Sequence, residues 1–275
     1  MLNEYFTWRH LRIHVQERGK GEPLLLINGL GANTDMWAPF AARFPDRRII
    51  LFDAPGTGRS GTPSRPMAIH GLAGLAVAVL DNRGIESTDV LGYSYGGAIA
   101  QQLAFESPAR VRRLVLAATN CGVGSILGSS QAMAVLSTPF RYYSPTYFHR
   151  TAAAAYGGRT GRNIKVRHRM MTARAKFPPT SLGYAFQVMG GVSWSSWHML
   201  DTIEHETLVI SGEDDPLIPV ANPEYLARNI PNATLDIVER AGHLFLVDDA
   251  KHLGERIRSF IEPIRVVDNV VAIAS

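Results

Sequence analysis

The sequence has little cysteine, no long apolar run and, over one long segment, no acidic residue. A single cysteine, Cys121, excludes an internal disulfide and a metal site built on several thiolates. The longest apolar stretches, such as Leu72–Leu80, are well short of the ~20 residues that a membrane-spanning helix needs, so we expect no integral membrane association. The first ten residues contain no basic region that leads into an apolar run. We therefore expect no signal peptide and a cytoplasmic protein.

The overall composition is that of a folded globular chain. Of its 275 residues, 46% are hydrophobic and 19% are charged, which excludes a disordered or fibrous protein. This length is near the upper limit for one compact domain, or it fits a domain that carries a large insertion. We found no internal repeat.

Acidic residues are absent between residues 121 and 200, although this segment contains nine lysines and arginines. The segment therefore has a charge of +9 and the rest of the chain a charge of −5, since the net charge is +4. Such a segment favours anionic lipid or a carboxylate-bearing ligand, or it is a solvated basic face that aids solubility. We expect no nucleic-acid partner, because no recognised binding motif is present and the basic residues are interspersed with Met, Tyr and Ala.

Short apolar runs alternate with helical patterns along most of the chain. The runs predict strands of a parallel sheet that is buried on both faces, at Leu24–Ile27, Ile49–Phe52, Val90–Leu91, Val111–Leu116, Leu208–Ile210 and Leu235–Val238. Helices are predicted between and after them, at about Thr34–Phe44, Met67–Arg83, Tyr95–Ser107, Pro219–Ile230 and Phe245–Ile261. Glu4–Gln16 alternates polar and apolar residues and predicts an antiparallel edge hairpin. The fold class is therefore α/β, built from βαβ units.

The regular alternation stops after Leu116 and resumes at Leu208. The interval contains glycine-rich turns, prolines, helical segments and five of the eight methionines. We predict that residues 120–204 form a helical cap, inserted into a core of residues 1–119 and 205–275. Met and Trp suit an adaptable apolar surface, so Met133, Trp194 and Trp197 are predicted to contact the substrate.

The strongest local motif is Gly92-x-Ser94-x-Gly96, which follows an apolar strand and precedes a helical pattern. Glycines at these two positions allow a tight strand-to-helix turn that exposes the serine hydroxyl. The turn also places the serine at a helix N-terminus, which favours developing negative charge. We predict that Ser94 is a nucleophile, and the alternative is a simple helix cap.

A serine needs a base to remove its proton, and His243 is the best placed of nine histidines. It follows the strand Leu235–Val238, so it lies at the same sheet edge as Ser94. The other eight lie on the hairpin, on helices, before a strand or in the cap.

The histidine in turn needs a carboxylate that fixes its tautomer. Three acidic residues, Glu213, Asp214 and Asp215, follow the strand Leu208–Ile210. We select Asp215, because Pro216 stiffens the turn directly after it and Pro219 can begin the next helix. Asp214 is the alternative.

Donors for an oxyanion are predicted in the loop that begins Asn28-Gly29-Leu30. Its glycines let the main chain approach a ligand, so we expect Asn28 and Gly29 to contact the substrate. The N–H groups of Leu30 and Tyr95 are predicted to form the oxyanion hole. An ordinary glycine turn is the alternative interpretation.

A second glycine motif, Gly56-x-Gly58-x-x-Gly61, fits a dinucleotide-binding pattern but lacks its context. Pro63 and Pro66 follow directly, so no helix begins at the glycines to receive a pyrophosphate. We interpret this segment as a tight loop beside the active site, and Cys121 as a small packed residue.

Taken together, these segments resemble the α/β-hydrolase superfamily. Within it, the chain is most similar to intracellular medium-chain-length poly(3-hydroxyalkanoate) depolymerases, on the segments Ala98-x-Ala100-Gln101-Gln102, Leu114–Thr119, Tyr156-Gly157-Gly158 and Gly191-x-Ser193-Trp194. The sequence departs from that family at Tyr93 and Tyr95, where Val and Trp are expected. The resemblance implies a mostly parallel eight-stranded sheet, helices on both faces and a helical cap.

The resemblance also implies a serine hydrolase that cleaves hydrophobic esters through an acyl-enzyme. Ser94, Asp215 and His243 would form its triad, with no metal or other cofactor. The partner would be a small or polymeric ester, with a storage-granule surface as a further partner, and the oligomeric state stays open. A general carboxylesterase is the first alternative, followed by cofactor-free haloperoxidase or perhydrolase chemistry and by a catalytically idle granule-binding protein.

Overall fold

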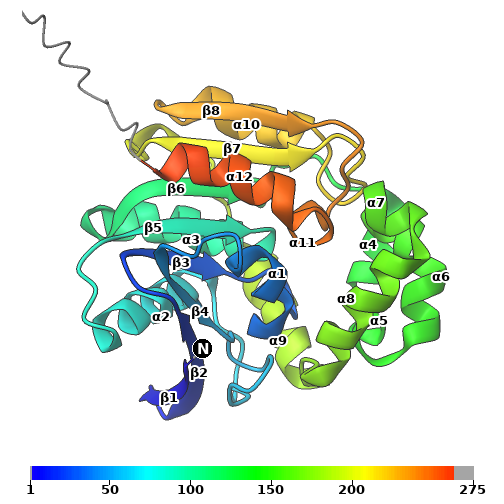
Figure 1. The fold of residues 1–275 in the computed structure, drawn as a ribbon, viewed down its shortest axis with the longest axis horizontal. Coiled ribbons are helices and arrows are strands. Elements are labelled where there is room, and N and C mark those ends of the chain that lie inside the picture. The colour runs from blue at the N-terminus through cyan, green and yellow to red at the C-terminus, as the bar shows by residue number, and fades with distance from the viewer. Residues whose placement is uncertain (1, 263–275) are drawn as a thin grey trace, which may run out of the picture.

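Eight strands form one sheet in the computed structural model, which describes residues 2–262 (Figure 1). Their order across the sheet is β1-β2-β4-β3-β5-β6-β7-β8. The strands β3 to β8 run parallel to one another, and the pairs β1/β2 and β2/β4 are antiparallel. The bounds are β1 Leu2–Trp8, β2 Leu11–Arg18, β3 Glu22–Ile27, β4 Arg47–Phe52, β5 Thr88–Tyr93, β6 Val111–Ala117, β7 Thr207–Gly212 and β8 Ala233–Val238. The predicted edge hairpin and mostly parallel sheet are confirmed.

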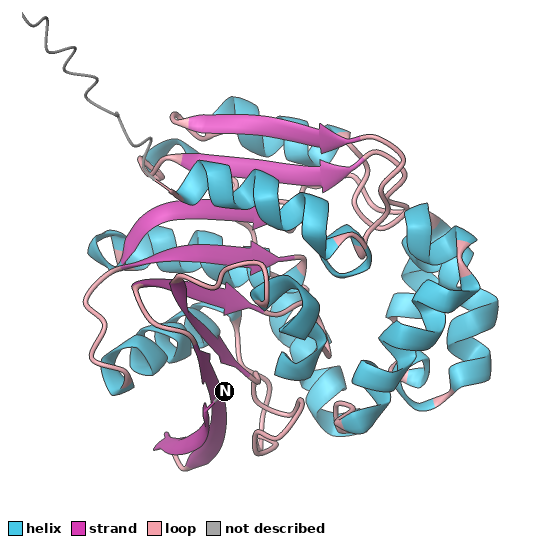
Figure 2. Cartoon of the chain, in the orientation of Figure 1, coloured by secondary structure: helices cyan, strands magenta, loops and turns pink. Residues whose placement is uncertain are grey.

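Helices cover both faces of the sheet, which accounts for the continuous apolar runs in the strands (Figure 2). Successive residues of β3 point to opposite faces, so that Leu24 and Leu26 join one core and Leu25 and Ile27 join the other. The first core includes residues of α1 (Ala38–Ala41), α11 (Phe245–Asp248) and α12 (Ala250–Ile261). The second includes residues of α2 (Ile69–Asn82), α3 (Tyr95–Glu106) and α10 (Ala221–Asn229).

Two predicted helices differ from the structure. The segment expected to be one helix from residue 34 to 44 is a 3₁₀ turn, Thr34–Trp37, followed by the short α1. The main-chain N–H of Thr34 donates to the buried Asp53 carboxylate at 2.7 Å, which ties the start of this segment to the neighbouring loop. The helix expected at 245–261 divides into α11 and α12, because Asp249 leaves the helical conformation (φ −131°, ψ 46°).

Six helices lie between β6 and β7, as expected for an inserted cap. They are α4 Ser130–Leu136, α5 Phe140–Tyr143, α6 Pro145–Tyr156, α7 Gly158–Arg162, α8 Ile164–Lys176 and α9 Ser181–Gly191. The helices α4 to α8 gather beside the carboxyl ends of the strands (Figure 1). We use the name cap for residues 120–204. Its bounds and those of the core, 1–119 and 205–275, stay predictions, and residues 263–275 lie outside the described part.

The cap is packed directly onto loops of the core. Gly158 has a φ of +50°, and a Cβ atom there would be 2.0 Å from the main-chain nitrogen of Gly242. Only glycine permits this approach.

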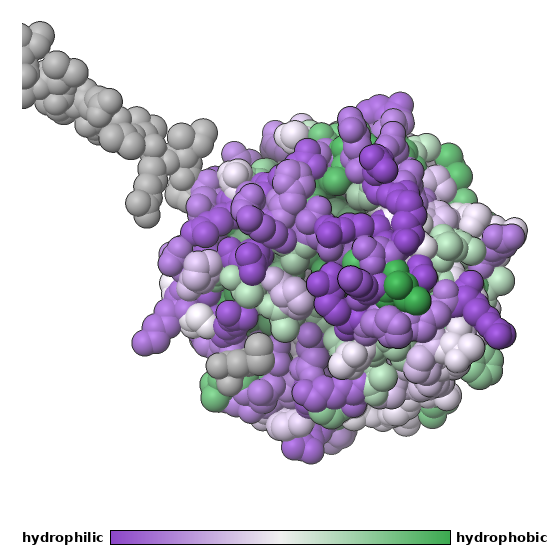
Figure 3. Space-filling view, turned by 45° about the vertical axis from the view of Figure 1, so that its right-hand side comes forward, coloured by the Kyte–Doolittle hydropathy of each residue, from purple (hydrophilic) through white to green (hydrophobic). Residues whose placement is uncertain are grey.

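The cap also carries ten of the fourteen large apolar side chains that are exposed in the described part, among a mostly polar surface (Figure 3). No helix in residues 2–262 has the length and apolar character that crossing a membrane requires.

Candidate active site

Ser94 occupies a strained turn between β5 and α3. Its φ of 55° and ψ of −119° are rarely adopted by residues other than glycine. Its N–H donates to the carbonyl of Ala117 at 2.8 Å, and its own carbonyl accepts from the Thr119 hydroxyl at 2.8 Å. A Cβ atom at Gly96 would lie 2.2 Å from the carbonyl oxygen of Ile27, so this position must be glycine. The local sequence therefore holds the serine in the geometry of a nucleophile turn.

His243 joins Ser94 to Asp215 through two hydrogen bonds. The Ser94 Oγ lies 3.0 Å from His243 Nε2, and His243 Nδ1 lies 2.7 Å from Asp215 Oδ2. With Nδ1 protonated, the ring donates to the carboxylate and its Nε2 is free to accept the serine proton. The other Asp215 oxygen accepts from the N–H groups of Leu217 at 2.8 Å and Ile218 at 3.1 Å. The structure thus brings together the three side chains selected from the sequence.

The main chain of His243 is held from two sides. Its N–H donates to the carbonyl of Tyr156 in the cap at 2.7 Å, and its carbonyl accepts from the Tyr93 hydroxyl at 2.6 Å. Burial raises the pKa of Tyr93 well above its ordinary value, so this hydroxyl stays a donor. The position of the imidazole therefore depends on a cap residue and on the residue that precedes the serine.

Asp214, the alternative acid, points elsewhere. Its carboxylate pairs with the guanidinium of Arg162 at 2.7 Å on the surface. The carboxylate of Glu213 accepts from the N–H of Arg240 at 3.0 Å. Of the three adjacent acidic residues, Asp215 is the one in contact with His243.

The N–H groups predicted for the oxyanion hole are available. Within residues 2–262, neither the Leu30 nor the Tyr95 amide donates to another protein group. Leu30 lines the cavity at Ser94, and its carbonyl accepts from the Tyr142 hydroxyl at 2.6 Å. Tyr95 begins α3, where N–H groups lack partners within the helix. This arrangement can stabilise an anion that forms beside Ser94.

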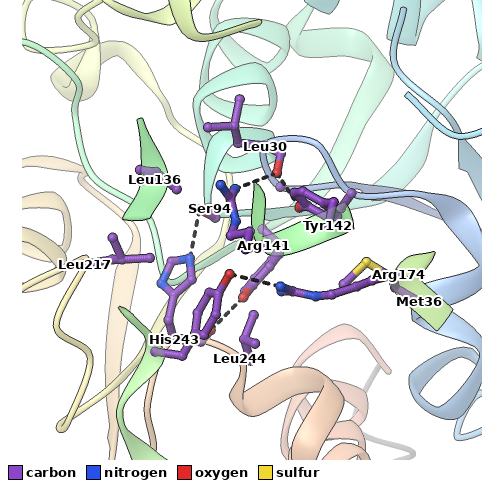
Figure 4. A pocket seen from close by; sticks show the side chains of 14 residues that line it. Leu30, Met36, Ser94, Leu136, Arg141, Tyr142, Arg174, Leu217, His243 and Leu244 are labelled. Carbon is purple, nitrogen blue, oxygen red and sulfur yellow. Dashed lines mark hydrogen bonds between the residues drawn. The ribbon is translucent and has the colours of Figure 1, made fainter. Parts of the chain in front are cut away.

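A small cavity of about 30 Å³ lies at Ser94 and His243. Figure 4 shows that its wall includes two arginines of the cap, Arg141 and Arg174, together with apolar side chains. The lining residues are Gly29, Leu30, Ala32, Met36, Tyr93, Ser94, Leu136, Arg141, Tyr142, Tyr156, Arg174, Leu217, His243 and Leu244. Neither arginine was predicted for the site, although the basic, acid-free character of residues 121–200 was a signal of their presence.

A second, larger cavity of about 340 Å³ lies between the cap and the core. Val166, Met170 and Ala173 of α8 form part of an apolar wall, and charged side chains line the rest. Met36 lines both cavities, so the two spaces adjoin at this side chain. Asp248 lies at the larger cavity, and burial raises its pKa to about 6.

The five residues expected to bind substrate lie in different places. Gly29 lines the Ser94 cavity, whereas Asn28 is buried beside it and accepts from the Trp37 indole N–H. The Trp194 indole donates to the Gln102 side chain at 2.7 Å. Trp197 is exposed, with its ring tilted by 45° against that of Tyr225, and Met133 packs against the core. Of the five, Gly29 alone is among the residues that line this cavity, so substrate binding by the others stays a prediction.

The second glycine motif, at residues 56–61, and Cys121 both lie outside the Ser94 cavity lining. The Asp53 carboxylate accepts from the N–H groups of Thr34 and Arg59 and pairs with His14, which holds the glycine-rich loop at residues 56–61 in place. Cys121 is buried, with its thiol 3.2 Å from the Ser125 hydroxyl. Between residues 2 and 262, we find no group of three or more His, Cys, Asp or Glu side chains arranged to hold a metal ion.

The sheet topology, the strained serine turn and the Ser94–His243–Asp215 contacts are those of an α/β hydrolase. Residues 22–250 match the family model of the alpha/beta hydrolase fold, and the chain belongs to this family.

Two curated proteins are similar to this chain over most of its length. The chain is 40% identical over 241 residues to a poly(3-hydroxyalkanoate) depolymerase of Ectopseudomonas oleovorans, which covers 87% of this chain and 84% of that protein. It is 30% identical over 267 residues to a 2-hydroxymuconate semialdehyde hydrolase of Pseudomonas putida, with 91% and 90% covered. Among solved structures, the enol-lactonase of Burkholderia xenovorans LB400 superposes with a TM-score of 0.81 at 22% identity, covering 94% of this chain and 99% of that one. The last likeness concerns the fold alone.

Proposed function

We propose that this protein is a serine hydrolase of hydrophobic carboxylic esters. The observation that carries the proposal is the continuous chain of hydrogen bonds from Ser94 through His243 to Asp215, at 3.0 and 2.7 Å. Such a chain lets the imidazole take the serine proton while the carboxylate stabilises the resulting imidazolium. The available amides of Leu30 and Tyr95 supply what the oxyanion requires.

The reaction would take place in two halves. Ser94 attacks the ester carbonyl while His243 takes its proton, and the oxyanion is held by the N–H groups of Leu30 and Tyr95. His243 then gives the proton to the departing alcohol, leaving an acyl-enzyme. Water, activated by the same imidazole, cleaves that intermediate and restores the serine.

We infer that the substrate is a poly(3-hydroxyalkanoate) or one of its oligomers. The 40% identity to a protein named as such a depolymerase supports this choice. The apolar part of the wall of the larger cavity suits an alkyl side chain, and the exposed apolar residues of the cap suit the surface of a hydrophobic polymer. A cytoplasmic location and contact with a storage granule belong to the same proposal.

A general carboxylesterase is the second candidate. The small volume of the cavity at Ser94, about 30 Å³, favours it, because such a space accepts a short acyl group. Haloperoxidase or perhydrolase chemistry has no comparable observation in its favour.

A hydrolysis panel tests the proposal. Wild-type protein and Ser94→Ala are compared on acetate and octanoate esters and on an emulsion of medium-chain polyhydroxyalkanoate. We expect acid release from the octanoate ester and the emulsion, and a loss of at least about 10³-fold in Ser94→Ala. Activity on short esters alone would favour the carboxylesterase, and no hydrolysis of any ester would refute the proposal.

A further inference from the structure

Two guanidinium groups are buried in the wall of the Ser94 cavity. Arg141 belongs to α5 and Arg174 to α8, and each is only 2% exposed. Both line the cavity that Ser94 and His243 line (Figure 4). The two cations come from helices far apart in the sequence, so the fold of the cap brings them to one place.

The hydrogen-bond partners of the two arginines are main-chain carbonyls and tyrosine hydroxyls. Arg141 donates to the carbonyl of Thr138 at 3.0 Å, to the carbonyl of Leu30 at 3.4 Å and to the Tyr184 hydroxyl. Arg174 donates to the Tyr156 hydroxyl at 2.9 Å. In the part of the chain that the structure describes, neither arginine pairs with a carboxylate, and the Nε–H of each has no acceptor.

Burying a cation without an anion is costly, and the fold avoids it elsewhere. The buried Arg47, for example, pairs with the buried Asp89 carboxylate. In the cavity, aromatic rings replace the anion in part, since the Arg174 guanidinium lies 4.9 Å from the ring centre of Tyr156. Burial tends to raise the pKa of Tyr156, but Arg174 and Arg141 together lower it below its ordinary value. The surroundings of these arginines are therefore positive and favour an anion.

We propose that Arg141 and Arg174 form a binding site for a carboxylate of the substrate. This inference rests on the proposed function. It means that the enzyme cleaves the ester bond next to the free acid end of a hydroxyalkanoate oligomer. The free N–H groups of a guanidinium bind a carboxylate through short charge-assisted hydrogen bonds. Ser94 displaces the alcohol half of the ester, and His243 protonates the departing alkoxide, so the released hydroxy acid carries the bound carboxylate. Water then hydrolyses the acyl-enzyme and restores the serine.

The test compares a charged substrate with a neutral one of closely matched structure. One is 3-(3-hydroxyoctanoyloxy)octanoic acid, and the other is its primary carboxamide, which has the same ester bond and nearly the same shape. We expect wild-type kcat/KM for the acid to exceed that for the amide by about 10- to 100-fold, the range of one or two charge-assisted hydrogen bonds.

Arginine variants test whether the preference for the acid over the amide arises in the Ser94 cavity. In Arg174→Gln we expect the acid-to-amide ratio to fall to within about 3-fold of unity, because only the acid uses the lost charge. Arg150→Gln is the matched control, since Arg150 is an exposed arginine of the same cap, and its ratio should equal that of wild type. The amide is an internal reference for any general damage to folding.

Binding to Ser94→Ala, measured by calorimetry with both ligands, checks the preference with the arginines intact. Equal kcat/KM or equal affinity for acid and amide would overturn the proposal and would mean that the tyrosines around the arginines already compensate their charge. A preference that survives in Arg174→Gln and Arg141→Gln would also overturn it. Failure to hydrolyse either compound would instead count against the ester hydrolase function itself.

Discussion

The two tyrosines that flank Ser94 allow a matched test of how the imidazole is held. The Tyr93 hydroxyl donates to the carbonyl of His243 at 2.6 Å, whereas the Tyr95 hydroxyl is buried without a hydrogen-bond partner in the described residues. Tyr93→Phe and Tyr95→Phe each remove one oxygen and leave the ring and the main chain unchanged. The two variants therefore differ in a single respect, the hydrogen bond to His243.

The expected effect of Tyr93→Phe depends on the burial of the His243 carbonyl. Tyr93→Phe leaves a buried carbonyl without a donor, which costs about 1–3 kcal/mol in the free energy of unfolding. If misplacement of His243 raises the activation free energy by about 1–2 kcal/mol, kcat falls roughly 5- to 30-fold. KM should stay within about 2-fold, because the phenyl ring still lines the cavity. Tyr95→Phe removes a hydroxyl that has no partner, so stability should be unchanged within about 0.5 kcal/mol or should increase.

Urea unfolding and steady-state hydrolysis of an octanoate ester measure both quantities. The account requires a loss of stability together with a loss of kcat in Tyr93→Phe, and neither loss in Tyr95→Phe. Reduced stability with unchanged kcat in Tyr93→Phe would refute the positioning role of this hydroxyl. Equal effects in the two variants would mean that the oxygen atoms act through packing alone.

Three further predictions concern the acids and the cavities. Asp215→Asn should lower kcat about 10⁴-fold, whereas Asp214→Asn, which breaks an exposed ion pair, should change it less than about 2-fold; the reverse order in ester hydrolysis would assign the triad acid to Asp214. The raised pKa of Asp248 makes wild-type stability fall as the pH rises from about 4 to about 6, so the stability of Asp248→Asn relative to wild type should rise by up to about 3 kcal/mol over that interval. A pH-independent difference in urea unfolding would contradict this. Met36 lines both cavities, so the larger side chain of Met36→Trp should obstruct an octanoyl chain that extends from Ser94 into the larger cavity. We expect kcat/KM to fall about 10-fold for octanoate esters and to stay within about 3-fold for acetate esters, and an equal loss on both would contradict use of the larger cavity by the alkyl chain.

Much of the site could be predicted from the sequence because its members lie at ends of strands. In a parallel sheet these ends share one edge, so Ser94, Asp215 and His243 could be selected from local patterns alone. Pro216 and Pro219 favour Asp215 over Asp214, and the structure places Asp215 in contact with the histidine. Such features need only short-range information and a known sheet direction.

The wall of the cavity could not be predicted in the same way. Arg141 and Arg174 lie on different helices of the cap, and their meeting depends on how those helices pack. Sequence patterns also do not distinguish an aromatic residue that faces the cavity from one that packs elsewhere, as Trp194 and Trp197 illustrate. The division of the last helix at Asp249 likewise depends on a local main-chain conformation that apolar periodicity does not report.

Labelling with a fluorophosphonate, followed by peptide mass spectrometry, tests the central claim that His243 makes the Ser94 hydroxyl nucleophilic. We predict that one phosphonyl group is added per chain at Ser94, that His243→Ala slows this addition by at least about 10³-fold, and that Ser94→Ala is not labelled. Labelling that persists in Ser94→Ala, or that proceeds at the same rate in His243→Ala, would contradict the account.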